Sequence, residues 1–307
     1  MHTQKFYSNG KLLITGEYLV LDGAKSLALP TKQGQYLSIS IKEEVIGILH
    51  WQSFDVHNNL WFSCSFSLSD FKIITSSNKN ISKTLYNIFL EIQKMNSDFL
   101  RNKNQVINVT TNLTFETNWG LGSSSTLINN IASWAKVNPF DLQFKIFGGS
   151  AYDIACAQHD KPIVYQLLNN KPIIEESVFN PLFKDRLFFV HLNKKQNSRD
   201  AILRYKKNKE NKKNAITEVT EITKKLVMTN SLIEFDSLLK EHEEIIATII
   251  GMKSIQQRMF SDYFGQIKSL GAWGGDFILA TGDSNTFSYF KEKGFETILP
   301  YKDIIAF

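Results

Sequence analysis

The residues best suited to chemistry are two glycines followed by three serines, in the stretch Gly120-Leu121-Gly122-Ser123-Ser124-Ser125. They lie between an alternating apolar segment at 107–115 and a segment with helical spacing at 127–135. A glycine turn that enters a helix leaves several backbone N–H groups without partners, and the helix dipole adds partial positive charge where they converge. Such a turn can bind a phosphate, and its hydroxyls can contact a phosphate oxygen or a metal ion.

The same stretch has a simpler interpretation as a turn followed by a serine N-cap. It is also not a Walker loop, because no Gly-Lys-Ser/Thr follows at the required spacing. If the turn binds a triphosphate, the positive side chain must come from elsewhere in the chain.

Two charged residues could complete such a site. Lys11 opens an apolar run beside a glycine, and from the end of a strand it could project toward a ligand. Asp153 lies among small residues where a helix is expected to begin after Gly148-Gly149. It could act as a catalytic acid or base, or it could simply be an acid in the first turn of a helix.

Other polar groups point to no separate chemistry. The basic stretch at 204–213 also carries Glu210 and several uncharged polar residues, which is typical of a solvated surface. His242-Glu243-Glu244 lacks the second histidine of a zinc helix, and the six histidines show no ligand spacing.

Strands and helices are predicted from the apolar periodicity. Alternation predicts strands at 37–41, 60–66 and 107–115, and shorter strand-like runs follow at 162–165 and 187–192. Helical spacing predicts helices at 85–92 and 127–135, and a mainly helical pattern at 198–264. A glycine-rich turn at 270–276 precedes a further strand. Prolines interrupt the strand-like segments in this region and predict a domain boundary near residue 175. The predicted domains are therefore 1–175 and 176–307.

Composition is that of a globular protein. The 307 residues are 43% hydrophobic and 12% aromatic, with a formal charge of +5 that suits anionic small molecules better than nucleic acid. Two cysteines form no disulfide framework, and no apolar run reaches membrane length. We therefore expect a cytoplasmic protein that binds neither membrane nor nucleic acid, as a monomer or homodimer.

Three of these motifs, in this order, resemble those of the GHMP kinases, the superfamily of galactokinase, homoserine kinase, mevalonate kinase and phosphomevalonate kinase. The segment at 10–23 resembles the first family motif, 120–125 the phosphate loop, and 271–276 the third motif. The resemblance spans nearly the whole chain. It implies a two-domain α+β fold, with an N-terminal domain like domain 2 of ribosomal protein S5 and a ferredoxin-like C-terminal domain.

Within this superfamily the sequence is most similar to the mevalonate and phosphomevalonate kinases. Glu17-Tyr18-Leu19-Val20-Leu21 resembles that branch and differs from the Glu-His-Thr-Asp form of galactokinases. Mevalonate kinases usually carry a metal-binding glutamate about one helix before the catalytic aspartate, whereas 141–149 contains none. This departure favours a phosphomevalonate kinase, or another member of the superfamily whose metal ion is held mainly by serine and ATP. Asn9, and Thr117-Asn118-Trp119 in place of a proline-containing segment, also depart from the family pattern.

The resemblance implies ATP and Mg²⁺ as cofactors and an anionic small-molecule acceptor. ATP phosphates would lie on the whole turn, formed by Gly120, Leu121, Gly122, Ser123, Ser124 and Ser125. Ser124 would hold the metal, with Ser123 as the alternative. Lys11 would neutralise charge near the transferred phosphoryl group. Asp153 would deprotonate or orient the acceptor, or, for an acceptor that is already an oxyanion, would chiefly hold Lys11 and the metal in place. The expected substrate-binding residues are Glu17, Ser198, Arg199, Gly274 and Gly275.

Two alternatives remain. The chain could be a GHMP kinase that acts on an alcohol such as mevalonate or a sugar. It could also be a non-catalytic protein of the same fold that serves as a sensor or binding partner, although Lys11, the serine turn and Asp153 are all retained.

Overall fold

The computed structural model describes residues 2–194, 202–203, 205–206, 212–273 and 275–307. The chain forms two compact units. The first unit consists of Met1–Gly10, Gln33–Thr117 and Gly122–Gln158, and the second of Lys11–Lys32, Asn118–Leu121 and His159–Phe307. Each unit therefore combines segments that are far apart in the sequence.

A mixed sheet forms the framework of the first unit. Its strands are β1 (His2–Leu13), β2 (Ser26–Glu43), β3 (Ile48–Phe54), β4 (Leu60–Ser67), β5 (Ile73–Ser76) and β6 (Gln105–Leu113). Residues 11–13 of β1 and 26–32 of β2 extend into the second unit. They pair in the order β5-β4-β3-β6-β2, and β1 pairs with β2. The β3 and β6 pair is parallel, and the other pairs of that order are antiparallel. The alternation predicted at 107–115 corresponds to β6, whose odd-numbered residues are all buried.

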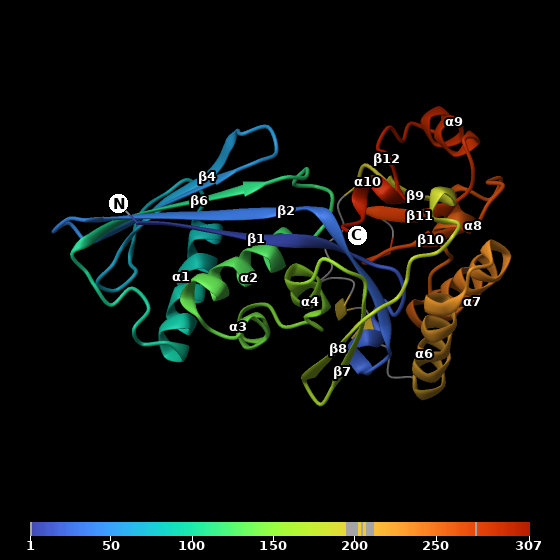
Figure 1. The fold of residues 1–307 in the computed structure, drawn as a ribbon, viewed down its shortest axis with the longest axis horizontal. Coiled ribbons are helices and arrows are strands. Elements are labelled where there is room, and N and C mark those ends of the chain that lie inside the picture. The colour runs from blue at the N-terminus through green and yellow to red at the C-terminus, as the bar shows by residue number, and fades with distance from the viewer. Residues whose placement is uncertain (1, 195–201, 204, 207–211, 274) are drawn as a thin grey trace. The chain divides into compact units, whose positions relative to one another are not determined.

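Four helices cover one face of this sheet (Figure 1). They are α1 (Lys79–Met95), α2 (Ser123–Ala135), α3 (Pro139–Ile146) and α4 (Tyr152–Gln158). Their apolar side chains, among them Phe89, Ile128, Leu142 and Ile154, form one core with the inward residues of the strands. Burial of this apolar stripe against the sheet is what stabilises the helices.

The second unit contains a four-stranded antiparallel sheet in the order β10-β11-β9-β12. The sheet strands are β9 (Leu187–His191), β10 (Ile267–Ser269), β11 (Phe277–Thr281) and β12 (Ile298–Pro300), and the helices that connect them are α6 (Lys213–Met228), α7 (Leu232–Ile250), α8 (Ile255–Met259) and α9 (Asn285–Glu292). This is the β-α-β-β-α-β order of a ferredoxin-like fold. The predicted ferredoxin-like C-terminal region is confirmed.

The second unit also contains several shorter elements. They are the 3₁₀ turns η1 (Leu19–Asp22) and η2 (Lys184–Arg186), the strands β7 (Ile163–Leu168) and β8 (Lys171–Glu176), and the short helix α10 (Tyr301–Ile304). Residues 26–28 of the long strand β2 pair with β7. A separate apolar cluster packs Leu19 of η1 against Val219 of α6 and Ile246 of α7.

Within the described residues, no helix combines the length and the apolar character needed to cross a bilayer. The predicted strands at 37–41, 60–66 and 187–192, and the predicted helices at 85–92 and 127–135, all correspond to observed elements.

Candidate active site

The glycine-serine turn enters α2 in the conformation that the sequence predicts. Gly120 and Gly122 have φ values of 67° and 92°, which favour glycine because a side chain is strained there. Gly122 is the N-cap of α2, and no side chain caps the helix at that position. The serine N-cap interpretation is therefore wrong, since the cap residue has no side chain. The first amides of α2 thus remain available to an anion.

The three serines of the turn differ in exposure. The Ser125 hydroxyl is buried and donates to the carbonyl of Gly122 at 2.8 Å. Ser124 is exposed and Ser123 is partly exposed. Ser124 and Ser123 therefore offer hydroxyls to a ligand, whereas Ser125 stabilises the turn itself.

Lys11 lies against this turn. Its Nζ donates to the carbonyl of Gly120 at 2.8 Å, and its backbone N–H donates to the carbonyl of Leu121 at 3.1 Å. The backbone contact aligns the end of β1 with the turn, so that the ammonium group is directed at Gly120. The structure thus brings together two of the features selected from the sequence, the lysine and the glycine turn.

Asp276 also contacts the turn, and sequence reasoning missed it. A Cβ added at Gly120 would lie 2.4 Å from Cγ of Asp276, so only a glycine permits this approach. The backbone of Asp276 is fixed on both sides, because its N–H donates to Lys194 and its carbonyl accepts from Leu192. The available signal was that Asp276 ends the third motif, directly before the strand β11.

The unusual residues before the turn are anchored on the sheet of the second unit. Trp119 packs edge-on against Phe277 with ring centroids 5.5 Å apart, and the carbonyl of Asn118 lies 3.2 Å from Nε2 of His191. Because His191 ends β9 and Phe277 begins β11, the sheet sets the path of the chain into the turn.

Asp153 lies in the first turn of α4, where a helix start was predicted. Its side chain is partly buried, and its Oδ1 accepts from the backbone N–H of Ile154 at 3.1 Å. The preceding Ala151 is buried and has φ 60°, a conformation that is costly for a residue with a side chain. This backbone fixes the point at which α4 begins. Asp153 belongs to the first unit and Lys11 to the second, and their pairing stays a prediction.

Three expected substrate-binding residues, Ser198, Arg199 and Gly274, lie outside the described residues. Gly275 is buried and directly precedes Asp276. Glu17 is only 1% exposed, and its Oε1 accepts from Nζ of Lys268 at 2.6 Å. The structure therefore places Glu17 within a buried ion pair.

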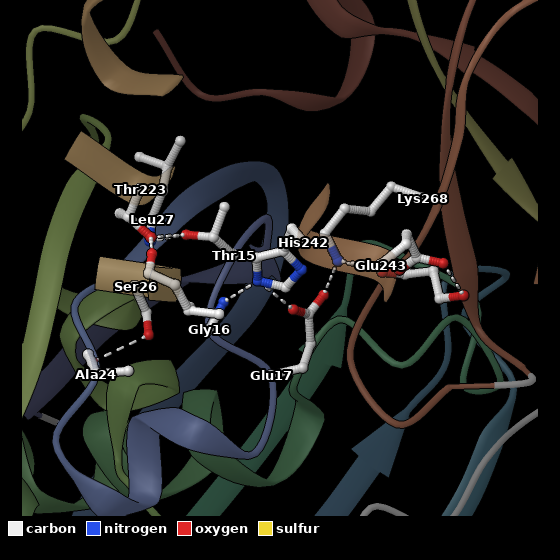
Figure 2. A network of polar contacts seen from close by, with 12 residues as sticks. Thr15, Gly16, Glu17, Ala24, Ser26, Leu27, Thr223, His242, Glu243 and Lys268 are labelled. Carbon is white, nitrogen blue, oxygen red and sulfur yellow. Dashed lines mark hydrogen bonds and ion pairs between the residues drawn. The ribbon is translucent and has the colours of Figure 1, made fainter. Parts of the chain in front are cut away.

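Figure 2 shows the polar cluster around that pair. We call it the Lys268 cluster, and it consists of Glu17, His242, Glu243, Lys268 and Ser269. Lys268 comes from β10, and His242 and Glu243 come from α7. The sequence signal for this cluster is weak, since Lys268 is a single charge among uncharged residues and His242-Glu243-Glu244 resembles only an incomplete zinc helix.

Burial governs the charges of this cluster. Burial raises the pKa of Glu17 to about 7, although the nearby Lys268 opposes the shift. Burial also raises the pKa of Glu243. The pKa of His242 is lowered well below its ordinary value by burial and then by the charge of Lys268. Accordingly, Nε2 of His242 accepts the backbone N–H of Gly16 at 2.8 Å, as a neutral imidazole can.

Gly16 connects this cluster to the first motif, and replacing it with alanine should destabilise the second unit. Its φ is 86°, and an added Cβ would lie 1.9 Å from Oγ of Ser26. We expect Gly16→Ala to lower the free energy of unfolding by roughly 2–4 kcal/mol, from steric overlap and backbone strain together. Urea denaturation measures the change.

Gly294→Ala is the matched control, because Gly294 has φ 85° and an added Cβ there meets no atom within 4 Å. Gly294→Ala should lower the free energy of unfolding only through backbone strain, by about 1 kcal/mol. Equal losses in Gly16→Ala and Gly294→Ala would contradict the steric explanation.

The described residues contain no group of three His, Cys, Asp or Glu side chains that could hold a metal ion.

Comparison with known proteins supports a conclusion about the fold of this chain. No protein-family model matches the sequence, and no curated protein matches it. Solved structures do match. Mevalonate kinase from Methanococcus jannaschii shares 17% identity at a TM-score of 0.69, covering 95% of this chain and 94% of that one.

Two further structures match over similar lengths. Phosphomevalonate kinase from Streptococcus pneumoniae, in complex with phosphomevalonate and AMPPNP, shares 15% identity at a TM-score of 0.66, covering 95% and 96% of the two chains. Galactokinase from Lactococcus lactis, complexed with galactose, shares 10% identity at a TM-score of 0.65, covering 95% and 88%. The predicted α+β architecture is confirmed, and the chain has the fold of the GHMP kinases.

Proposed function

We propose that this chain is an ATP-dependent kinase of the GHMP type that phosphorylates a small anionic acceptor, most favourably phosphomevalonate. The observation that carries the proposal is the ammonium group of Lys11 at 2.8 Å from the carbonyl of Gly120, in the turn that leads along the chain to α2, a helix with no side-chain cap at its start. A helix N-terminus and a fixed lysine form a binding site for the phosphates of a nucleotide. The fold, shared with kinases that act on mevalonate, phosphomevalonate and galactose, supports the same interpretation.

In this proposal the protein catalyses mainly by positioning and by stabilising charge. The amides at 122–125 hold the nucleotide phosphates. Lys11 neutralises charge that spreads over the transferred phosphoryl group. Asp153 orients the acceptor and accepts its proton when the acceptor is an alcohol.

Mg²⁺ fits the residues that are present. Ser124 has an exposed hydroxyl, and the carboxylate of Asp276 contacts the same turn at Gly120. A carboxylate beside phosphates is repelled unless a cation lies between them, and Mg²⁺ prefers oxygen ligands. We assign Ser124 as the expected metal ligand and add Asp276 as a second candidate. When bound, the metal ion would neutralise phosphate charge.

The preference for a phosphorylated acceptor rests on the absence of a glutamate at 141–149 and on the cations at 194–199 in the sequence. A phosphate acceptor is already an oxyanion near neutral pH, so it depends less on a base and more on positive side chains. Lys194, Lys195 and Arg199 are the candidates, together with Ser198, Gly274 and Gly275 on the substrate side.

An ADP-release assay with three acceptors tests the proposal. With ATP, Mg²⁺ and phosphomevalonate we expect acceptor-dependent ADP release, and with mevalonate or galactose a rate lower by at least tenfold. Faster release with mevalonate would assign the chain to the alcohol kinases. Nucleotide binding without ADP release from any acceptor would instead favour the non-catalytic sensor.

A further inference from the structure

We propose that Lys268 is a positioning residue for phosphoryl transfer, because it holds together the two chain segments that place Lys11 and Asp276 on Gly120. The inference rests on the proposed function and extends it to a buried group that touches no substrate. Lys268 itself is fully buried in β10, within the second unit.

The ammonium group of Lys268 makes contacts in three directions. Nζ donates to Oε1 of Glu17 at 2.6 Å, to the carbonyl of Ser269 at 2.8 Å and to Oε1 of Glu243 at 3.4 Å. A lysine ammonium has three N–H donors, so each donor has one acceptor. The Ser269 hydroxyl completes the arrangement by donating to Oε2 of Glu243 at 3.0 Å. One side chain therefore joins the first motif, α7 and β10 (Figure 2).

Both chain segments that leave this cluster reach the same glycine. Upstream of Glu17, the chain runs back through Gly16 and Thr15 to Lys11, whose Nζ bonds to the carbonyl of Gly120. Downstream of Ser269, the chain runs through the glycine-rich turn to Asp276, whose carboxylate packs on the Cα of Gly120. The positions of Lys11 and Asp276 on the turn thus depend on the same ion pair. A displacement of about 1 Å at reacting groups can lower turnover by about 10²-fold.

Burying the charged side chains of the Lys268 cluster in the core costs free energy. Buried ion pairs are often no more stabilising than apolar side chains of the same volume. Here two carboxylates face one ammonium group, and Oε2 of Glu17 and Nδ1 of His242 have no hydrogen-bond partner. Such a group is better explained by the geometry that it imposes than by a gain in stability.

The same imbalance makes the cluster sensitive to pH. The titratable groups that face Glu17 are Lys268 from β10 and Glu243 and His242 from α7. Burial raises the pKa of Glu17 from 4.5 to about 7. Above that pH Glu17 is ionised and forms the full ion pair with Lys268, and below it the pair is weakened. Turnover should therefore rise as the pH increases through about 7.

Stability should change in the opposite direction. Between pH 4.5 and about 7 the folded protein keeps a proton on Glu17 that the unfolded chain has lost. Folding is therefore favoured at the acidic end of this window, and the stabilisation is lost as the pH rises through 7. Each unit of pH in this window should change the unfolding equilibrium by up to about tenfold.

The experiment compares Glu17→Gln and Lys268→Met with the wild-type chain. For Glu17→Gln we expect kcat at pH 8 to fall at least tenfold, with KM for ATP changed less than threefold, and the rise of kcat near pH 7 to disappear. In Glu17→Gln the free energy of unfolding should also depend less steeply on pH, by the slope that corresponds to about one proton exchanged on unfolding. Lys268→Met should lower kcat at least as much as Glu17→Gln. If Lys268→Met does not fold, the result for Glu17→Gln is sufficient to test the positioning role. Glu244→Gln is the matched control, because Glu244 is the exposed neighbour of Glu243 on α7.

Hydrogen–deuterium exchange separates this inference from the proposed kinase activity. In Glu17→Gln, exchange at 14–22 and 270–276 should accelerate about tenfold, while exchange in α9 stays unchanged. If the wild-type chain transfers no phosphoryl group, the proposed function fails, and the exchange data still test the positioning role. Unchanged exchange together with an unchanged pH profile of kcat would overturn the inference.

Discussion

Replacing Asp153 with asparagine is expected to lower kcat by about 10²-fold or more while leaving the affinity for AMPPNP within threefold of the wild-type value. The substitution keeps the shape of the side chain at the start of α4 and removes its charge. A carboxylate base contributes about 10²- to 10⁴-fold for an alcohol acceptor. With a phosphate acceptor, the loss would come from misplacement of Lys11 and the metal ion. Steady-state ADP release and titration with AMPPNP measure the two quantities.

Asp141→Asn is the control for this experiment. Asp141 is an exposed acid in the first turn of α3, as Asp153 is a partly buried acid in the first turn of α4. Its replacement should leave kcat unchanged. If Asp153→Asn also retained full turnover, Asp153 would have no part in the mechanism.

Adding one methyl group at Gly120 is expected to disrupt nucleotide binding. In Gly120→Ala the new Cβ would lie 2.4–2.7 Å from the carboxylate atoms of Asp276, so either the turn or Asp276 must move. Movement of the turn displaces the amides at 122–125 and the carbonyl that holds Lys11. We expect the affinity for AMPPNP to fall at least tenfold, measured by isothermal titration calorimetry.

Gly251→Ala controls for backbone strain. Gly251 caps the end of α7 with φ 65°, close to the 67° of Gly120, and an added Cβ there meets nothing within 4 Å. It should leave AMPPNP affinity unchanged. In the double variant Gly120→Ala/Asp276→Ala, part of the lost thermal stability should return, because the carboxylate is gone. An affinity as low in Gly251→Ala as in Gly120→Ala would refute the steric account.

Local patterns predicted the elements that carry the site. Alternation at 107–115 predicted β6, and helical spacing at 127–135 predicted α2. These predictions succeed because burial on one face imposes a period on the sequence. The simpler interpretation with a serine N-cap is wrong because glycine can adopt the left-handed conformation that this helix start requires, and Gly122 takes that position.

Contacts between distant segments could not be predicted from periodicity. Glu17 and Lys268 are separated by 251 positions, and only the fold shows that the carboxylate is paired and buried. Likewise, nothing in the sequence places Asp276 against Gly120, since each lies in a glycine-rich turn with its own local explanation. Segments 11–32 and 159–307 pack into one unit for the same reason: tertiary packing leaves no periodic signal.

The most direct measurement is the structure of the chain crystallised with AMPPNP, Mg²⁺ and phosphomevalonate. It should show nucleotide phosphates on the amides at 122–125, Nζ of Lys11 within reach of the terminal phosphate, and the Asp153 carboxylate facing the acceptor. A nucleotide bound away from the start of α2, or phosphates that contact neither Lys11 nor these amides, would contradict the account.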